Sequence, residues 1–154
     1  MSEELMVGDR KVEEVNMEQL IELLNGDLSR EYQAIITYIQ YAASVTGPYR
    51  QELKGFFAGE IPDETMHAQY LADKIAALGG VPSVTAEAVP QETNVKKMLE
   101  NIVEAERTAR NNYSTRAKQA DALGEVGLAN HLEDMAEDES GHLDETLKIL
   151  RGWN

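Results

Sequence analysis

Two glutamate–histidine pairs are the residues of this chain best suited to chemistry. Glu64 stands three positions before His67, and Glu139 stands three positions before His142. Side chains three residues apart share one face of a helix, so each pair would present a carboxylate and an imidazole together. A buried carboxylate needs a compensating charge, and carboxylate with imidazole is a ligand set that suits iron or manganese. Each pair alone is also consistent with a satisfied polar group in a core.

A longer internal repeat adds two glutamates to this pattern. Glu31 precedes Glu64 by 33 residues, and Glu106 precedes Glu139 by 33 residues. The chain contains only three histidines, so chance is a poor explanation for two copies in the same register. Four carboxylates and two imidazoles at one level of a core would be neutralised by two divalent cations. The repeat therefore predicts a di-metal site, which without metal would have to take up protons or water.

A tyrosine accompanies each copy of the repeat, seven residues after its first glutamate. Tyr38 follows Glu31 and Tyr113 follows Glu106 at this spacing. We interpret both tyrosines as core aromatics whose hydroxyl groups hydrogen-bond a carboxylate, with a redox role as the alternative. His131 lacks a glutamate partner and is expected at the surface. The other nearby acids are expected on solvated helix faces: Glu133, Asp134, Glu137 and Asp138.

Four stretches in which apolar side chains recur at steps of three and four must position these residues. They cover residues 16–45, 48–80, 93–122 and a last stretch that ends near residue 150. The segment 81–92 has two prolines and no helical stripe, whereas the other two connections are short. The pattern predicts an all-α four-helix bundle with one long crossover between the second and third helices. Residues 16–151 would form this bundle, and residues 1–15 a flexible N-terminal arm.

The composition limits the classes of function. The formal net charge of −14 repels nucleic acid and anionic membranes and attracts cations. The absence of cysteine excludes disulfides, iron–sulfur clusters and thiol catalysis. Residues 1–15 do not resemble a signal peptide, and no apolar run is long enough to span a bilayer. We expect a soluble, cytoplasmic protein that binds neither nucleic acid nor a membrane.

The segments around these residues resemble bacterioferritin and its ferritin-like relatives. The likeness extends over residues 16–147 and includes LSREYQAIITY, DETMHA, GGVPS and EDESGHLDETL. It implies a ferritin-like bundle with a di-iron ferroxidase centre that oxidises Fe(II) with O2 or H2O2, for iron storage or detoxification. The ligands of the two iron ions, with manganese as an alternative metal, would be Glu31, Glu64, His67, Glu106, Glu139 and His142. On this resemblance the second glutamate of each copy would bridge the metals, each first glutamate would be a terminal ligand, and each histidine would bind one metal.

Several positions depart from the bacterioferritin pattern. Thr65 stands where bacterioferritins carry the methionine that ligates haem, and Met66 follows one position later, which weighs against haem. Only 12 residues follow His142, too few for the short fifth helix of that family, which favours a dimer or a dodecamer over a larger shell. Pro62 would kink the second helix near a ligand, and Gly141 would weaken the fourth helix.

Apolar side chains outside the internal stripe of the first helix also indicate a homo-oligomer. They are Tyr32, Ile36, Ile39 and Tyr41. A single bundle needs only one apolar stripe per helix, so we expect this second group to pack between subunits.

Two other classes of function remain open. The first is a related redox enzyme: a rubrerythrin-like peroxidase, a manganese catalase or a small-molecule di-iron oxidase. Rubrerythrins carry an additional glutamate one turn from the third-helix ligand, where this chain has Val103 and Ala109. The second class is a non-catalytic metal-binding bundle or a DNA-protecting mini-ferritin. The net charge argues against DNA, and mini-ferritins place their site between subunits, whereas both glutamate–histidine pairs lie in one chain.

Overall fold

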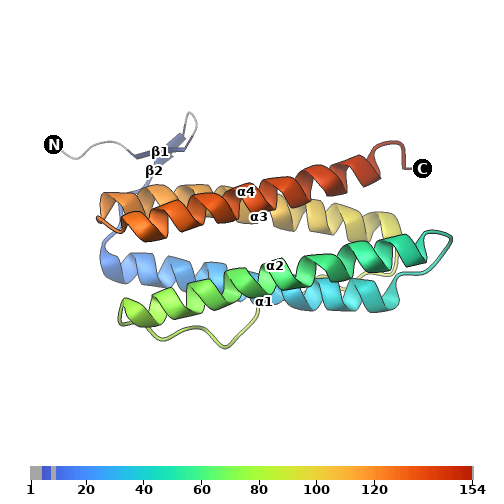
Figure 1. Cartoon of the computed structure of the whole chain (residues 1–154), viewed down its shortest axis with the longest axis horizontal. Coiled ribbons are helices and arrows are strands. Elements are labelled where there is room, and N and C mark those ends of the chain that lie inside the picture. The colour runs from blue at the N-terminus through green and yellow to red at the C-terminus, as the bar shows by residue number, and fades with distance from the viewer. Residues whose placement is uncertain (1–4, 8–9, 154) are drawn as a thin grey trace.

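Four long helices make up most of the protein. The computed structural model describes residues 5–7 and 10–153, with helices α1 (Met17–Ser44), α2 (Arg50–Ala77), α3 (Val95–Ala122) and α4 (Val126–Leu150). α1 packs mainly against α2 and α3 against α4, so two helical hairpins face each other (Figure 1). This architecture confirms the predicted all-α bundle with one long crossover between the second and third helices. None of the helices in the described part of the chain is both long and apolar enough to cross a membrane.

The helix ends follow from the local sequence. The Asn16 side chain caps α1 by accepting a hydrogen bond from the Gln19 backbone N–H, and the Gln19 side chain accepts one from the Asn16 backbone N–H. Asn94 caps α3 by accepting from the backbone N–H of Lys97. α2 ends before Gly79, whose φ of 91° is a left-handed conformation that favours glycine.

One polar stripe of α1 holds the crossover against the bundle. Its members are Asn25, Ser29, Gln33 and Tyr41. The Asn25 side chain donates to the Val81 carbonyl at 3.0 Å and accepts from the Ser83 backbone N–H at 2.8 Å. Further along α1, the Tyr41 hydroxyl donates to the Pro90 carbonyl at 2.6 Å. The crossover therefore runs along α1 and covers this face of the helix within one chain.

The group of α1 residues available for contacts between subunits is therefore smaller than the sequence predicts. Tyr41 is 1% exposed, and its ring centroid lies 6.0 Å from that of Phe57. Tyr32 is half-buried against the core. Ile36 and Ile39 are exposed at 39% and 48%. The interpretation of Tyr41 as a residue between subunits is wrong, because α2 and the crossover already enclose it.

A short hairpin precedes α1. Strands β1 (Leu5–Val7) and β2 (Arg10–Val12) pair antiparallel, and the hairpin contacts α3. The backbone carbonyl of Glu13 accepts a hydrogen bond from the Gln119 side chain of α3 at 3.0 Å. The predicted flexible arm at residues 1–15 thus includes paired backbone, although part of it lies outside the described residues. Its flexibility stays a prediction.

Two hydrophobic clusters fill the bundle on either side of one polar level. The first includes Leu20, Leu24, Leu28, Leu71, Ile75, Ala117, Leu128 and Leu132. The second includes Tyr38, Tyr41, Val45, Leu53, Phe57, Met98, Leu99 and Ile102. Along α1, Leu28 of the first cluster and Tyr38 of the second flank Glu31. Each of the other predicted glutamates has the corresponding place on its own helix, so the bundle brings four carboxylates to one level.

Candidate metal centre

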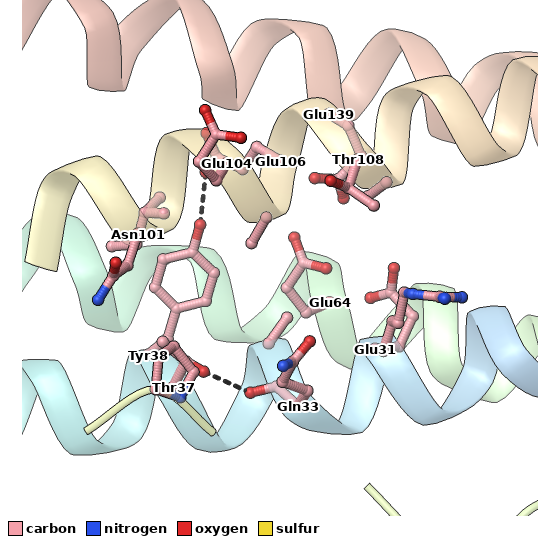
Figure 2. A pocket seen from close by; sticks show the side chains of 16 residues that line it. Glu31, Gln33, Thr37, Tyr38, Glu64, Asn101, Glu104, Glu106, Thr108 and Glu139 are labelled. Atoms are coloured by element: carbon pink, nitrogen blue, oxygen red, sulfur yellow. Dashed lines mark hydrogen bonds between the residues drawn. The ribbon is translucent and has the colours of Figure 1, made fainter. Parts of the chain in front are cut away.

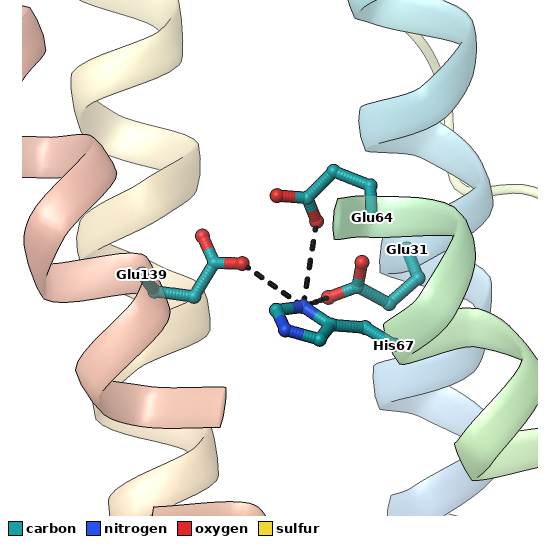
Figure 3. A group of neighbouring side chains, drawn as sticks. All are labelled: Glu31, Glu64, His67 and Glu139. Atoms are coloured by element: carbon teal, nitrogen blue, oxygen red, sulfur yellow. Dashed lines mark ion pairs between the residues drawn. The ribbon is translucent and has the colours of Figure 1, made fainter. Parts of the chain in front are cut away.

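The six predicted ligands lie at this polar level. They are Glu31 of α1, Glu64 and His67 of α2, Glu106 of α3, and Glu139 and His142 of α4. All four glutamates are only 2–3% exposed. Glu31, Glu64, His67 and Glu139 each offer one ligand atom within 4.8 Å of the others, and their side chains converge from α1, α2 and α4 (Figure 3). The bundle thus contains a buried group of donors close enough to share a metal ion.

Two of the carboxylates lie between the two histidines. Glu139 places Oε1 3.3 Å from His67 Nδ1 and Oε2 3.8 Å from His142 Nδ1. Glu64 places Oε2 3.9 Å from His67 Nδ1 and Oε1 3.4 Å from His142 Nδ1. Each of these carboxylates therefore turns one oxygen toward each imidazole. A ligand shared by two metals requires this arrangement.

Glu106 lies at the edge of the cluster. Its side chain lines the same cavity as the other three glutamates (Figure 2), but it does not belong to the group whose ligand atoms lie within 4.8 Å of one another. Both of its oxygens accept hydrogen bonds, Oε1 from Tyr38 at 2.5 Å and Oε2 from Thr146 at 3.2 Å. Four of the six predicted ligands therefore form one group, His142 lies beside two of its members, Glu64 and Glu139, and Glu106 is turned toward Tyr38 and Thr146.

Both predicted tyrosines bond to a carboxylate of the site. Tyr38 of α1 donates to Glu106 Oε1, and Tyr113 of α3 donates to Glu31 Oε1. Each hydroxyl binds the glutamate of the opposite helical hairpin, so the two bonds join the halves of the bundle. The interpretation of these tyrosines as hydrogen-bonding core aromatics is confirmed, and a redox role stays the alternative.

Acidic residues hold the outer nitrogen of each imidazole. His67 Nε2 lies 3.0 Å from Asp138, and His142 Nε2 lies 3.1 Å from Asp63 and 2.7 Å from Glu60. An N–H donated outward from Nε2 leaves the Nδ1 lone pair facing the cluster, as a metal ligand requires. Asp138, predicted on a solvated face, is 55% exposed yet bonds to His67. The missed signal is the aspartate that directly precedes the glutamate in both pairs.

Unpaired polar atoms test whether this cluster fits metal ions. Among the described residues, six buried side-chain oxygen or nitrogen atoms have no hydrogen-bond partner, and one of them is Glu60 Oε2. The other five belong to predicted ligands: Glu31 Oε2, Glu64 Oε1, His67 Nδ1, Glu139 Oε1 and His142 Nδ1. Buried polar atoms are almost always paired in native proteins, so this concentration at one level indicates a cation-binding role. Because carboxylate and imidazole donors suit iron or manganese, the residues fit a di-metal centre.

Burial and repulsion between carboxylates change the titration of the cluster. Burial raises the pKa of Glu31, Glu64 and Glu106, to about 8 for Glu106, and the charge of a neighbouring glutamate adds to each increase. Burial lowers the pKa of His67, but the nearby carboxylates, Glu139 first and then Glu31 and Asp138, outweigh it and raise that pKa to about 11. The pKa of His142 is raised in the same way. Without metal the cluster therefore holds protons, as the sequence predicts.

A cavity of about 320 Å³ reaches the carboxylates from the side of α1 and α3 (Figure 2). All four predicted glutamates line it, together with the small side chains of Ala34, Ala105 and Ala109. The residues that line it include neither His67 nor His142. The acids that bond to the outer nitrogens belong to α2 and α4 instead. The cavity therefore opens on the carboxylates of the cluster, and acidic side chains lie on the other side, behind the imidazoles.

Other residues singled out by the sequence have ordinary surroundings. α2 continues as one helix through Pro62, so the proline does not interrupt it. The Thr65 hydroxyl donates to the Ile61 carbonyl of its own helix, and Met66 is 64% exposed. His131, expected at the surface, is half-buried and stacks on the Tyr70 ring with centroids 3.5 Å apart.

Comparisons with known proteins agree with this geometry. A family model described as a ferritin-like domain matches residues 21–154, whereas no curated protein matches the chain significantly. The chain is similar to a ferritin-like, di-iron carboxylate protein from Bacillus anthracis, with 46% identity and a TM-score of 0.85 over 87% of this chain and 96% of that one. It is also similar to a bacterioferritin-related dodecameric thioferritin from Bacteroides fragilis, with 26% identity and a TM-score of 0.74 over 90% and 89% of the two chains.

A third solved structure relates the fold to a di-iron site. The bacterioferritin of Desulfovibrio desulfuricans, described with its di-iron site in different catalytic states, has 26% identity and a TM-score of 0.79 over 88% of this chain and 80% of that one. The four-helix bundle, the buried carboxylate–imidazole cluster and the family match lead to one conclusion: this chain belongs to the ferritin-like family.

Proposed function

We propose that this chain binds two iron ions and oxidises Fe(II) with O2 or H2O2, for iron storage or detoxification. The proposed ligands are Glu31, Glu64, His67, Glu106, Glu139 and His142. The observation that carries the proposal is the concentration of buried, unpaired carboxylate and imidazole atoms at one level of the bundle. Glu64 and Glu139 would bridge the metals, since each carboxylate turns one oxygen toward His67 and the other toward His142. Each remaining glutamate would be a terminal ligand.

The residues of the chain would prepare the centre for this reaction. Two Fe(II) ions would supply the two electrons that, together with two protons, convert H2O2 to two water molecules or O2 to H2O2. The acids behind the imidazoles, Asp63 and Asp138, fix the ring orientation that aims Nδ1 inward. The net charge of −14 attracts Fe(II) to the protein surface. The cavity at the carboxylates gives the oxidant a route that does not pass the imidazoles.

Removal of one bridging carboxylate tests this function. Glu64→Gln and Glu139→Gln should each abolish the fast phase of ferric absorbance after aerobic addition of Fe(II), because each shared ligand serves both metals. Glu133→Gln is the matched control, since it removes the same charge from an exposed position of α4. The control should oxidise about two Fe(II) per chain in the fast phase, the capacity of a di-iron carboxylate centre. Unchanged kinetics in both bridging variants would exclude the ferroxidase assignment.

The identity of the bound metal and haem can be tested on protein purified from its native host. We expect elemental analysis to find iron, with manganese as the alternative metal. We expect no haem, because Thr65 stands at the family's haem-ligand position and bonds to its own helix. Met66 is 64% exposed on α2 and is the residue that could ligate a haem shared between subunits. A Soret band in the purified protein would contradict this expectation.

We further propose that the protein is a homo-oligomer, a dimer or a dodecamer. Ile36 and Ile39 of α1 and Met66 of α2 are large apolar side chains that remain exposed in the single chain. Contact between copies would cover these side chains. The related protein from Bacteroides fragilis is described as a dodecamer. Light scattering should give a particle mass well above the 17.1 kDa of one chain, and a monomer mass would refute the proposal.

The cavity favours a second candidate function, oxidation of a small organic molecule. Its volume of about 320 Å³ exceeds what O2 or H2O2 needs and falls within the range of small-molecule sites, which begins at about 300 Å³. Ala105→Leu would fill part of the cavity from a position that is not itself a predicted ligand. If an organic substrate uses the cavity, ligand-observed NMR should detect small organic probes that bind wild type and not this variant. Absence of such binding, with normal Fe(II) oxidation in both proteins, would leave ferroxidase activity as the function.

A further inference from the structure

The two halves of the proposed centre are not equivalent. The first half-site consists of Glu31 and His67, and the second half-site consists of Glu106 and His142. Glu64 and Glu139 lie between them. The first half-site, with both shared glutamates, offers four ligand atoms within 4.8 Å of one another. Among the described residues, Glu106 joins no such group, so only the first half-site is assembled.

Hydrogen bonding explains why Glu106 is withdrawn. Glu31 accepts one hydrogen bond, from Tyr113 to Oε1, and its Oε2 is unpaired. Glu106 accepts two, from Tyr38 to Oε1 at 2.5 Å and from Thr146 to Oε2 at 3.2 Å. The Glu31 carboxylate has only one hydrogen bond and can turn about it, whereas the Glu106 carboxylate is hydrogen-bonded at both oxygens.

The internal repeat isolates Thr146 as the cause of this difference. Tyr38 and Tyr113 are equivalent positions of the repeat, so a tyrosine bond is common to both half-sites. Thr146 lies four residues after His142, and the position four residues after His67 is Leu71. Thr146 and Leu71 are both 0% exposed, so both side chains face the interior of the bundle. The second half-site thus has a hydroxyl where the first has an apolar side chain.

We propose that the half-sites fill in order, the Glu31–His67 half-site first, and that Thr146 is the positioning residue that sets this order. The inference rests on the proposed di-metal function. A metal ion at His142 Nδ1 requires Glu106 to turn toward that nitrogen, and the Thr146 hydrogen bond opposes the turn. The one proton of the Thr146 hydroxyl is shared between Glu106 Oε2 at 3.2 Å and the His142 carbonyl at 2.8 Å, and the contact with the carbonyl keeps the hydroxyl at this place on α4. A metal ion at His67 meets no corresponding restraint.

Calorimetric titration of the metal-free protein with Co(II) tests the order of filling through metal binding alone, without an activity assay. Wild type should bind two Co(II) per chain in two resolved steps. Thr146→Val should tighten the second step by roughly tenfold, the effect of about 1.4 kcal/mol, and leave the first step unchanged. Thr146→Ser should restore the wild-type titration because it keeps the hydroxyl. Thr37→Val is the control, since Thr37 is a buried threonine with the same bond to its own helix, at 2.7 Å to the Gln33 carbonyl, and no carboxylate partner is recorded for it in the described structure.

Anomalous scattering from wild-type crystals soaked with one equivalent of Co(II) provides a test that does not depend on the folding of any variant. The signal should lie beside His67. A signal beside His142, or a Thr146→Val titration identical to that of wild type, would overturn the proposed order. Two equal Co(II) sites would refute the order and leave the di-metal function intact. Absence of Co(II), Mn(II) and Fe(II) binding would refute both proposals.

Discussion

Two buried polar clusters of this bundle differ in how completely they are hydrogen-bonded. Arg116 of α3 binds Asp27 of α1 through two bonds, Nε to Oδ2 at 2.8 Å and Nη2 to Oδ1 at 3.1 Å. Arg116 also donates to Gln119, which in turn donates to the Glu13 carbonyl. No side-chain atom of this Asp27–Arg116 cluster is among the unpaired buried atoms of the described residues. The candidate metal centre, one turn further along α1, contains five such atoms.

This difference shows which property of a buried charge indicates function. Burial raises the pKa of Asp27, against the effect of Arg116, just as it raises the pKa of Glu31. A raised pKa therefore does not separate the two clusters. The completeness of hydrogen bonding does, because the Asp27–Arg116 cluster is satisfied by the protein itself, whereas the unpaired atoms of the candidate metal centre would need an added cation or protons. We infer a structural role for the first cluster, and for the second the metal-binding role of the proposed function.

Removal of Arg116 from the Asp27–Arg116 cluster should produce the largest loss of stability. Arg116→Met removes both hydrogen bonds of the buried Asp27 carboxylate and leaves it only Arg30, whose Nη1 lies 3.9 Å away. This loss should lower the free energy of unfolding by about 3–5 kcal/mol. Urea unfolding of the metal-free protein measures this change. The double variant Asp27→Leu/Arg116→Met is the control and should recover most of the lost stability, since it removes both charges. A stable Arg116→Met protein would show that Asp27 is not held by this pair.

Removal of a carboxylate from the candidate metal centre should raise the free energy of unfolding of the metal-free protein. Glu64→Met replaces a carboxylate that has an unpaired buried oxygen, so the metal-free protein should become more stable by about 1–3 kcal/mol. The same variant should lose the stabilisation that Co(II) or Mn(II) gives to wild type. Urea unfolding with and without metal measures both effects. A loss of stability in the metal-free variant would mean that Glu64 is structural, like Asp27, and would remove the contrast between the clusters.

The sequence was sufficient to predict the elements and the level of the site. Apolar residues at steps of three and four fix the inward face of each helix, and Glu31 and Glu64 lie on those faces in the same register as Glu106 and Glu139. Asn16 also marks the start of α1, because its side chain and Gln19 form a capping box that depends on four adjacent residues. These features are local or periodic, and a single chain displays them directly.

Contacts that depend on the path of the chain were not predictable in this way. The sequence predicts Asp138 on a solvated face, and its side chain is indeed half exposed, but its bond to His67 exists only once α2 and α4 pack together. Tyr41 lies off the internal stripe of α1, and its burial depends on where the crossover passes, near Pro90. The withdrawal of Glu106 requires the position of Thr146 across two helices.

The stability of the metal-free protein should depend on pH through the carboxylates and imidazoles of the candidate metal centre. The pKa of Glu106 is raised from 4.5 to about 8, so the folded protein retains a proton there that the unfolded chain releases. The pKa of His67 is raised from 6.5 to about 11, with the same sign. Stability should therefore fall as the pH rises from 6 to 8, by about 1 kcal/mol per pH unit for each group that titrates in only one state. Thermal unfolding of the metal-free protein at pH 6, 7 and 8 measures this fall in stability.

Metal should reverse this pH dependence, because a bound cation replaces the protons and is favoured as the pH rises. The Asp27–Arg116 cluster provides no such reversal, so the difference between metal-free and metal-loaded curves isolates the metal centre. A metal-free protein whose stability rises between pH 6 and 8 would contradict the raised pKa values of Glu106 and His67.

A substitution at Gly141, beside the predicted ligand His142, tests whether helix stability and metal binding can be changed separately. Gly141 precedes His142 in the middle of α4, and a Cβ added there would meet nothing within 4 Å. Gly141→Ala should therefore stabilise the protein by ~1 kcal/mol through helix propensity alone, with Co(II) stoichiometry unchanged. Gly80→Ala is the contrasting control, because its Cβ would lie 2.6 Å from Ile21 Cγ2 and should destabilise the protein by about 1–3 kcal/mol. If Gly141→Ala stabilises the fold but loses a Co(II) ion, the centre depends on backbone freedom beside His142, and hydrogen bonding alone does not distinguish it from the Asp27–Arg116 cluster.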